Sequence, residues 1–151
     1  MTLAALMTEL QHRVRSRSDE VDHGYTSPCW ISNRARHAKG YTKMGLCGQT
    51  LLTHRVAYEA YVGPIPDGLQ IDHLCRQTAC CNPDHLEPVT CRENLLRGDT
   101  RTAAQAAATH CKRGHPYDEA NTYTRHDRPG VRGCKACRNS WRKRSTPAHP
   151  A

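Results

Sequence analysis

Cysteine and histidine side chains gather in two close-set clusters, and this feature constrains the fold more than any other. One cluster has the spacing His-x-Cys-x4-Cys-x4-His and runs from His73 to His85, whereas the other joins Cys-x3-His at 111–115 to Cys-x2-Cys at 134–137. The chain has 151 residues but no Phe, and only 37% of its residues are hydrophobic. A core this poor in apolar side chains usually needs disulfides, metal ions or a partner subunit to fold. The clusters make metal ions the expected source of stability.

The nine cysteines bear on the compartment as well as on the fold. Residues 1–17 lack a basic segment before their apolar stretch, which is too short and interrupted for a signal peptide or a membrane span. We therefore expect a cytoplasmic protein with no membrane partner, in which thiols stay reduced and clustered cysteines bind metal. An odd number of cysteines also fits poorly with a complete set of disulfides. Zinc is the expected ion.

Basic residues are concentrated in the last third of the chain. Residues 1–100 hold 11 Lys and Arg against 11 Asp and Glu, whereas residues 101–151 hold 11 against 3, which accounts for the whole net charge of +8. Such a segment suits DNA, because phosphate contacts dominate the affinity of proteins for it; the alternative is a solvated tail. The basic residues expected to contact double-stranded DNA are Arg132, Lys135, Arg138, Arg142, Lys143 and Arg144.

Hydrophobic spacing predicts an α+β fold with few short strands and helices. Apolar residues recur at helical spacing in two segments, and two short apolar runs flank a cysteine-containing loop. Thr90 and Glu93 have the spacing of a capping box, which predicts a helix that ends before Gly98. The predicted helices cover residues 2–17, 51–62 and 90–97, and the predicted strands cover residues 69–72 and 86–89.

Changes in composition divide the chain into four parts. Residues 99–109 are small and polar, which predicts a linker or an exposed helix, and the last residues are basic and then rich in proline. The predicted parts are an N-terminal helix and extension (1–22), a core with the first cluster (23–100), a linker with the second cluster (101–138) and a basic flexible tail (139–151).

The second cluster offers four ligands for a tetrahedral zinc ion. Cysteine and neutral histidine are the ligands that zinc prefers, and each pair has the short spacing of a zinc knuckle. Metal binding would supply the folding free energy that so small a core lacks. The expected ligands are Cys111, His115, Cys134 and Cys137, with His110 as an alternative to His115.

The first cluster offers Cys75, Cys80 and His85 and needs a fourth zinc ligand from elsewhere. We choose Cys29, because it sits beside Trp30 in the first ordered segment and would tie that segment to the core. Four protein ligands leave no open position for water, so this zinc would be structural. The other candidates are Cys47, Cys91 and Cys81, the last of which would have little room beside its neighbour.

Asp72, His73 and Asn94 remain without a role at zinc. The oxygens of Asp72 and Asn94 are hard ligands that suit Mg²⁺ or Mn²⁺. Neutral His73 could accept a proton from an attacking water, because the pKa of histidine lies near neutrality. Each residue alone more often has a structural role, but together they suit metal-assisted hydrolysis of a phosphodiester.

The stretch from Asp72 to Asn94, with DHLC, CCNPDHLEPVT and EN, resembles the HNH (ββα-metal, or His-Me finger) endonucleases. Its ligand spacing is similar to that of the His-Cys box homing endonucleases. HRVAYEAYVGPIPDG (54–68) and CKRGHPYDEANTY (111–123) are similar to parts of short HNH proteins of phages and actinobacteria. The resemblance implies a zinc-stabilised nuclease core, His73 as the general base, and Asn94 with Asp72 as ligands of the catalytic cation.

Several positions depart from the family pattern or need assignment. Many HNH enzymes have Asn at the position of His85, so here this residue is expected to serve zinc. Asn82 is interpreted as a loop residue that orients the active-site turn. The homing enzymes use an arginine to support the leaving group, and the candidates here are Arg34, Arg36 and Arg55.

The sequence therefore predicts a metal-dependent DNA endonuclease, homing-type or phage-associated, in a bacterial cell or a phage-infected host. A homodimer is expected from the family and the small core. The alternative is a non-catalytic zinc-containing DNA-binding protein, but such a protein has no use for Asp72 and His73 beside Asn94. It should also place a recognition helix after its ligands, where this chain has a short basic run. A third candidate is an inactive relative or a nuclease acting on RNA.

Overall fold

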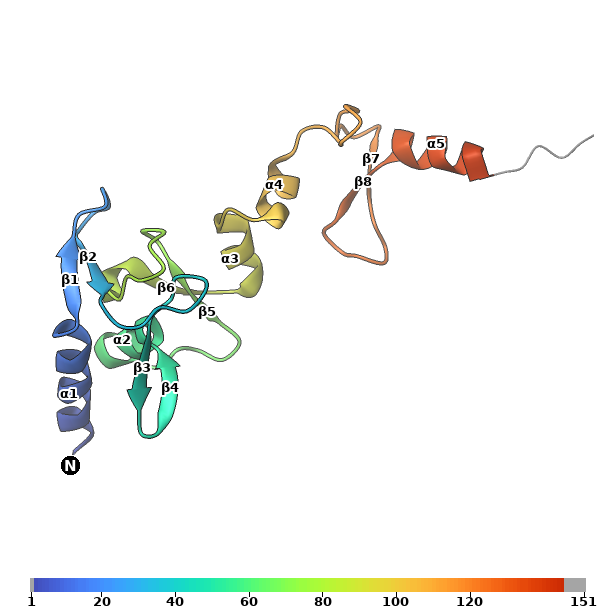
Figure 1. Cartoon of the computed structure of the whole chain (residues 1–151). Coiled ribbons are helices and arrows are strands. Elements are labelled where there is room, and N and C mark those ends of the chain that lie inside the picture. The colour runs from blue at the N-terminus through green and yellow to red at the C-terminus, as the bar shows by residue number, and fades with distance from the viewer. Residues whose placement is uncertain (1, 146–151) are drawn as a thin grey trace, which may run out of the picture. The chain divides into compact units, whose positions relative to one another are not determined.

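The computed structural model describes residues 2–145, with side chains as far as Arg142 (Figure 1). The chain divides into two compact units, Met1–Leu95 and Leu96–Ala151. The predicted α+β class is confirmed.

The helices are α1 (Leu3–Arg15), α2 (Thr53–Tyr61), α3 (Cys91–Arg97), α4 (Arg101–Ala107) and α5 (Lys135–Ser145), with a 3-10 helix, η1 (Pro83–His85). The strands are β1 (Ser18–Val21), β2 (Cys29–Ser32), β3 (Lys43–Leu46), β4 (Gln49–Leu52), β5 (Gln70–His73), β6 (Leu86–Val89), β7 (Thr122–Thr124) and β8 (Arg132–Cys134).

The described strands form four separate antiparallel pairs, β1 with β2, β3 with β4, β5 with β6, and β7 with β8. A two-stranded ribbon is marginally stable by itself, because it has little surface to bury. Each ribbon must therefore be held by helices, loops or bound ions. None of the helices formed by residues 2–145 has the length and apolar character needed to cross a membrane.

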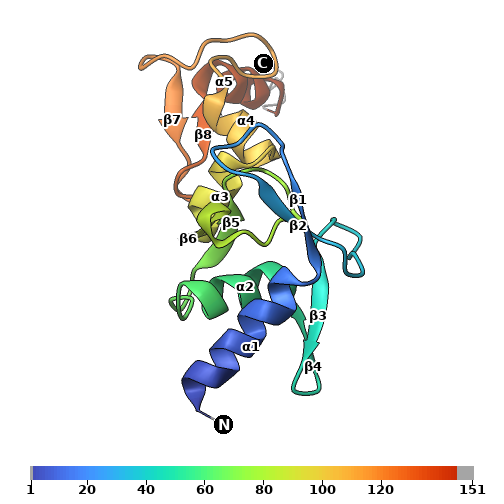
Figure 2. The same cartoon turned by 90° about the vertical axis from the view of Figure 1, so that its left-hand side faces the viewer.

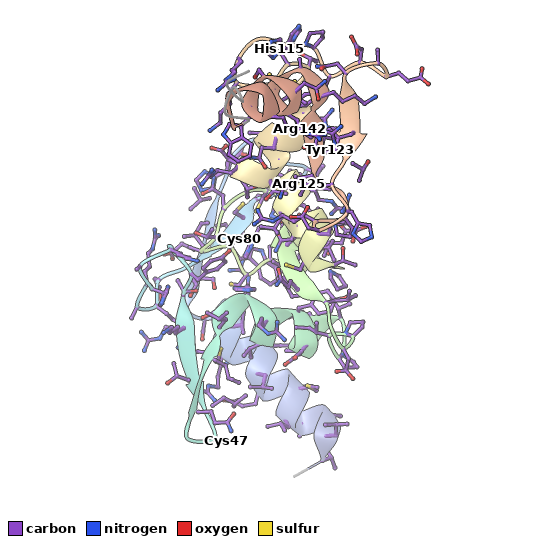
Figure 3. All side chains as sticks on the ribbon, turned by 90° about the vertical axis from the view of Figure 1, so that its right-hand side faces the viewer. Cys47, Cys80, His115, Tyr123, Arg125 and Arg142 are labelled. Atoms are coloured by element: carbon purple, nitrogen blue, oxygen red, sulfur yellow. The ribbon has the colours of Figure 1, made fainter. Side chains whose placement is uncertain are left out.

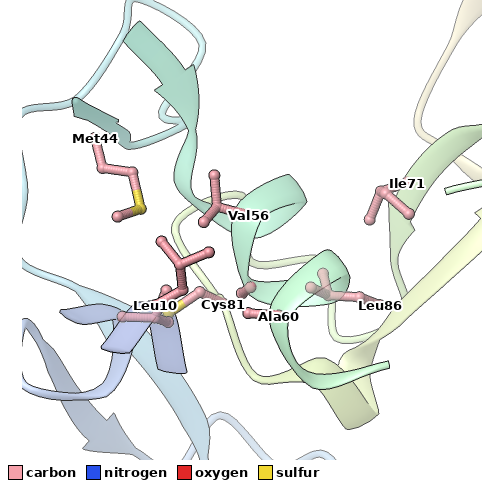
Figure 4. Close-up of a cluster of buried hydrophobic side chains, with 9 residues drawn as sticks. Leu10, Met44, Val56, Ala60, Ile71, Cys81 and Leu86 are labelled. Carbon is pink, nitrogen blue, oxygen red and sulfur yellow. The ribbon is translucent and has the colours of Figure 1, made fainter. Parts of the chain in front are cut away.

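The core of the first unit lies between α1 and α2, which cross one another in Figure 2. Leu10 of α1 is buried with Val56 and Ala60 of α2 (Figure 4), and Val14 of α1 belongs to the same buried cluster. The side chain of Gln11 donates to the carbonyl of Ala60 over 2.8 Å, which fastens the two helices at their polar edge. Residues 1–22 were expected to form an N-terminal helix and extension; the helix is present as α1, but it is part of this core, and β1 pairs with β2. The difference arises because the apolar face of α1 has a partner that is distant in the sequence.

The β5–β6 ribbon and α3 follow one another as strand, strand and helix. The observed strands lie within one residue of the predicted ones. Glu93 accepts hydrogen bonds from the backbone and side chain of Thr90 and donates its own backbone N–H to the Thr90 hydroxyl, as the capping box requires. The helix predicted over 51–62 begins at Thr53, because the two leucines before it belong to β4.

The second unit contains α4, the β7–β8 ribbon and α5. Residues 101–107, expected as linker or exposed helix, form α4, whose N-cap is Thr100. Residues 139–145 were assigned to a flexible tail, but they continue α5, which starts at Lys135. Residues 146–151 of the expected tail lie outside the described part of the chain.

Candidate functional site

Backbone pairing brings Cys29 to the first cluster. Cys81 donates its N–H to the carbonyl of Trp30 over 2.9 Å, and Ser32 donates to the carbonyl of Ala79 over 3.0 Å. These bonds lay β2 alongside the loop that contains Cys80. The thiol of Cys29 thereby comes within 3.5 Å of Nδ1 of His85.

The ligand atoms of Cys29, Cys75, Cys80 and His85 all lie within 4.8 Å of one another, so this cluster could hold a metal ion. A tetrahedral zinc site has S···N edges of about 3.6 Å and S···S edges of about 3.8 Å, given its usual bond lengths. The Sγ–Nδ1 distances from His85 are 3.5 Å to Cys29 and 3.6 Å to Cys80. The donor set and its spacing therefore fit zinc.

Surrounding groups orient these ligands. Nε2 of His85 lies 2.8 Å from the hydroxyl of Ser27, which leaves Nδ1 to face the thiols. The N–H of Asn82 points at Sγ of Cys80 over 3.4 Å, and its side chain donates to the carbonyl of Pro28 over 2.9 Å. Asn82 therefore fastens the loop to the segment before Cys29, in line with its interpretation as a loop residue.

The other candidate fourth ligands lie elsewhere. Cys47 is exposed in the turn between β3 and β4, at the opposite end of the first unit from Cys80 in Figure 3. Cys91 is exposed at the start of α3. Cys81 is buried, but its thiol lies 3.0 Å from the hydroxyl of Ser18 and 3.3 Å from the carbonyl of Trp30. None of the three belongs to the four-ligand group.

His73 is buried at the end of β5, with one ring nitrogen engaged by the backbone. Its Nε2 lies 3.1 Å from the carbonyl oxygen of Cys80. A carbonyl can only accept, so Nε2 carries the proton and Nδ1 has the lone pair of the neutral ring. Burial lowers the pKa of His73, against the opposing effects of the Cys80 carbonyl and Asp72. Burial is the largest of these effects, so it favours the neutral ring, whose Nδ1 can accept a proton.

His54 lies against His73, a contact that the sequence reasoning missed. It is buried at the start of α2, and the two rings meet edge to face with centroids 4.7 Å apart. Tyr41 contacts both rings, at 5.3 Å from His54 and 5.8 Å from His73. Burial lowers the pKa of His54 to about 3, so this ring is also neutral. The signal in the sequence was a histidine on the apolar side of a predicted helix.

Asp72 is buried, with 4% of its surface exposed, and its Oδ1 accepts a hydrogen bond from Nη1 of Arg76 over 2.8 Å. Glu87 stands directly opposite Asp72 in the β5–β6 register, so the two acidic residues share one face of the ribbon. The sequence reasoning named neither Arg76 nor Glu87.

Asn94 is held against the same strand. Its Nδ2 donates to Oε1 of Gln70 over 3.0 Å. Gln70 and Asp72 are two residues apart in β5, so they lie on the same face of the strand. Asn94 therefore approaches the face of Asp72, and its Oδ1 is the atom that could serve as a ligand.

The three candidate arginines for the leaving group differ in their surroundings. Arg34 donates to the carbonyl of Arg13 over 2.6 Å, and Arg36 forms an isolated bridge with Thr42. Arg55 directly follows His54 in α2. Of the three, Arg55 is therefore next in the chain to a residue that contacts His73.

The second cluster has the same geometry as the first. The ligand atoms of Cys111, His115, Cys134 and Cys137 lie within 4.8 Å of one another. Nδ1 of His115 is 3.4 Å from Cys111, 3.7 Å from Cys134 and 3.3 Å from Cys137. His110 is outside this group and instead contacts the hydroxyl of Thr109. This cluster could also hold zinc.

Several basic residues expected at DNA are engaged within the second unit. Nη2 of Arg132 lies within 3.0 Å of the carbonyls of Gln105, Ala106 and Ala108, where it caps the end of α4. Lys135 donates to the carbonyl of Ala120 over 2.8 Å, and Arg138 covers the ring of Tyr123. Arg142 is exposed on α5. The side chains of Lys143 and Arg144 lie outside the described residues.

Comparison with known proteins assigns a family to the segment that carries this site. Residues 51–96 match the family model described as HNH endonuclease. The predicted resemblance to HNH endonucleases is confirmed over these residues, whereas the finer likeness to His-Cys box homing enzymes stays a prediction.

The relatives are phage proteins. The chain is 43% identical over 44 residues to "Uncharacterized gene 5.3 protein" of Enterobacteria phage T3, covering 29% of the chain and 44% of the relative. It is 32% identical over 88 residues to "Protein 2.8" of Escherichia phage T7, covering 57% of each. "Protein 7.7" of the same phage is 34% identical over 58 residues, covering 38% of the chain and 45% of the relative. The chain thus spans about half the length of these relatives, and no solved structure matches it.

The HNH segment contains the candidate catalytic residues and three of the four ligands of the first cluster. Asp72, His73 and Asn94 lie within it, as do the newly found Arg76 and His54. The fourth ligand of the first cluster, Cys29, lies outside the segment, as does the whole second cluster. The HNH segment therefore depends on β2, which lies earlier in the chain, to complete a four-ligand set.

Proposed function

We propose that this protein is a metal-dependent DNA endonuclease that hydrolyses phosphodiester bonds, with His73 as the general base. The hydrogen bond from Nε2 of His73 to the carbonyl of Cys80 carries this proposal. It fixes the tautomer in which Nδ1 can accept a proton, on a residue within the HNH segment. The match of residues 51–96 to HNH endonucleases supports a nuclease activity.

His73 would take a proton from the water that attacks phosphorus. A useful base must be unprotonated before the reaction, and burial favours the neutral ring by lowering the pKa of His73. The ring is held between the Cys80 carbonyl and the side chains of His54 and Tyr41, so its orientation is restricted before substrate arrives.

Asp72 and Asn94 would hold the catalytic cation, Mg²⁺ or Mn²⁺. Their carboxylate and amide oxygens fit a hard divalent ion, and the Asn94–Gln70 hydrogen bond keeps them on one face of β5. When bound, such an ion stabilises the charge that develops on the phosphate and on the leaving oxygen.

Both Cys/His clusters would hold structural zinc, because each offers four protein ligands. Double-stranded DNA is the proposed substrate, with the basic residues of positions 101–151 contributing phosphate contacts. A homodimer would place two active sites on the two strands. The cytoplasm of a bacterial or phage-infected cell is the proposed location, given the phage relatives.

Cleavage of plasmid DNA tests this function. Zinc-loaded protein with Mg²⁺ or Mn²⁺ should nick or linearise the plasmid, and His73→Ala and Asn94→Ala should each lower the rate at least 100-fold, as expected for loss of a general base or metal ligand. His12→Ala, a change at an exposed histidine of α1, is the matched control and should cut as the wild type does. A wild type that binds DNA but never cuts would instead support the non-catalytic DNA-binding protein.

A further inference from the structure

Arg76 forms an ion pair with the carboxylate of Asp72, which is a proposed ligand of the catalytic cation. Its Nη1 lies 2.8 Å from Oδ1 of Asp72, and the side chain of Arg76 is 49% exposed whereas that of Asp72 is 4% exposed. The guanidinium thus reaches from the solvent side to a buried acid.

The backbone presents Arg76 to Asp72 in a sharp turn. The N–H of Arg76 donates to the carbonyl of His73 over 3.0 Å. Arg76 has a φ of +59°, a left-handed conformation that residues with a side chain rarely adopt. The turn places the guanidinium immediately beside the Asp72–His73 pair, on an exposed loop where it can change partners.

The charges of the neighbouring groups determine how the Arg76–Asp72 pair responds to a bound cation. Arg76 forms an ion pair with Asp72, and Glu87 stands opposite Asp72 on the same face of the ribbon. A divalent ion bound to Asp72 would lie beside the guanidinium of Arg76 at a poorly solvated position, where like charges repel strongly. A phosphodiester carries one negative charge, which would offset part of this repulsion. The cation and Arg76 are thus compatible when a DNA phosphate is present and compete when it is absent.

We propose that Arg76 couples cation binding to phosphate binding: its guanidinium pairs with Asp72 in the unliganded site and transfers to the scissile phosphate when cation and DNA bind. This inference rests on the proposed function, because it takes Asp72 as a cation ligand. Arginine suits the second role, since its planar fork of N–H groups matches phosphate oxygens. By linkage, DNA must raise the affinity for the cation by the same factor as the cation raises the affinity for DNA.

Mn²⁺ titration by calorimetry, on full-length protein with both clusters saturated with zinc, tests the coupling. Without DNA, Arg76→Ala should bind Mn²⁺ at least fivefold more tightly than the wild type. Arg15→Ala removes the same charge from another Arg–carboxylate pair, that with Glu20, and should leave the affinity unchanged. A duplex added in a His73→Ala background, which prevents cleavage, should tighten Mn²⁺ binding at least tenfold. In the Arg76→Ala, His73→Ala double variant, that gain should fall below threefold.

The outcomes separate this inference from the proposed function. Equal or weaker Mn²⁺ binding by Arg76→Ala, with two zinc ions retained, would show that Arg76 only orients Asp72 and would overturn the coupling. Arg76→Lys keeps the charge and should bind Mn²⁺ as the wild type does, so tighter binding by this variant also contradicts the inference. If Asp72→Asn binds Mn²⁺ as the wild type does, the cation site itself is wrong, and the proposed function fails together with the coupling.

Discussion

Cys80 joins the zinc-capable cluster to the candidate general base, because its carbonyl lies 3.1 Å from Nε2 of His73 while its thiol lies 3.6 Å from Nδ1 of His85. One residue therefore sets both the tautomer of the base and one corner of the metal site. The integrity of the first cluster should therefore affect the proposed role of His73, even if the zinc there is purely structural.

Loss of a ligand in the first cluster should therefore reduce activity through His73. Cys80→Ser keeps the carbonyl but weakens the metal site, and we expect a roughly 10- to 100-fold loss of cleavage, the range seen when groups that support a metal site are altered. Nitrogen NMR of the imidazole should report the Nε2-protonated tautomer in the wild type and a mixture in the variant. A variant with wild-type cleavage and an unchanged tautomer would contradict this link.

Zinc content tests the ligand sets directly. Wild-type protein purified under reducing conditions should contain about two zinc ions per chain, and Cys29→Ser should contain about one. Cys47→Ser is the matched control, because this thiol is exposed in the β3–β4 turn, and it should retain both ions. If Cys29→Ser keeps two ions, a different residue completes the first site.

The contribution of α1 to the first unit can be measured as the change in the free energy of unfolding when residues of α1 are replaced. Leu10 is buried in the core, so Leu10→Ala should lower the free energy of unfolding by roughly 2–4 kcal/mol. Leu3 lies on the same helix but is 72% exposed, so Leu3→Ala should change it by less than about 0.5 kcal/mol. Urea denaturation of the zinc-loaded protein gives both values. Equal effects would mean that α1 is an extension after all.

The ring of His54 should matter for packing more than for proton transfer. His54→Ala removes the contact with His73 and Tyr41 and should cost about 2–4 kcal/mol of stability. His54→Phe preserves a ring of similar shape and should keep at least a tenth of wild-type cleavage. Cleavage by His54→Phe as low as that of His73→Ala would show that a nitrogen of His54 takes part in the reaction.

Local spacing predicted the parts of this protein that depend on neighbours in the chain. The ββα order and the capping box of Thr90 and Glu93 arise within a few residues, so periodicity and cap chemistry were sufficient. Three ligands of the first cluster and all four of the second are likewise recognisable from short spacings. Cys29 was chosen only for its neighbour Trp30, and the structure brings it to the other ligands through backbone pairing.

Contacts between segments that are distant in the sequence could not be predicted from local spacing. The meeting of His54 and His73 requires α2 to dock beside β5, and no short spacing encodes that distance. Arg76 reaches Asp72 from a left-handed turn that has no glycine to mark it. Arg132 was assigned to DNA from its charge alone, whereas its guanidinium caps α4. The distribution of charge in the sequence indicated a basic segment, but not which of its basic side chains form contacts within the fold.

The ligands Cys29 and His85 stand far apart in the sequence, so a metal ion bound by the first cluster would cross-link distant parts of the chain. An ion held there would close a loop that contains α2 and β5, and a permanent closure of that length lowers the entropy of the unfolded chain by an amount worth about 4 kcal/mol. The cost of closing a loop grows slowly, by only about 0.6 kcal/mol for each doubling of length. The exposed turn at Cys47 lies inside this loop. Extra residues inserted at that turn should therefore leave the closed loop, and the site within it, nearly as stable as before.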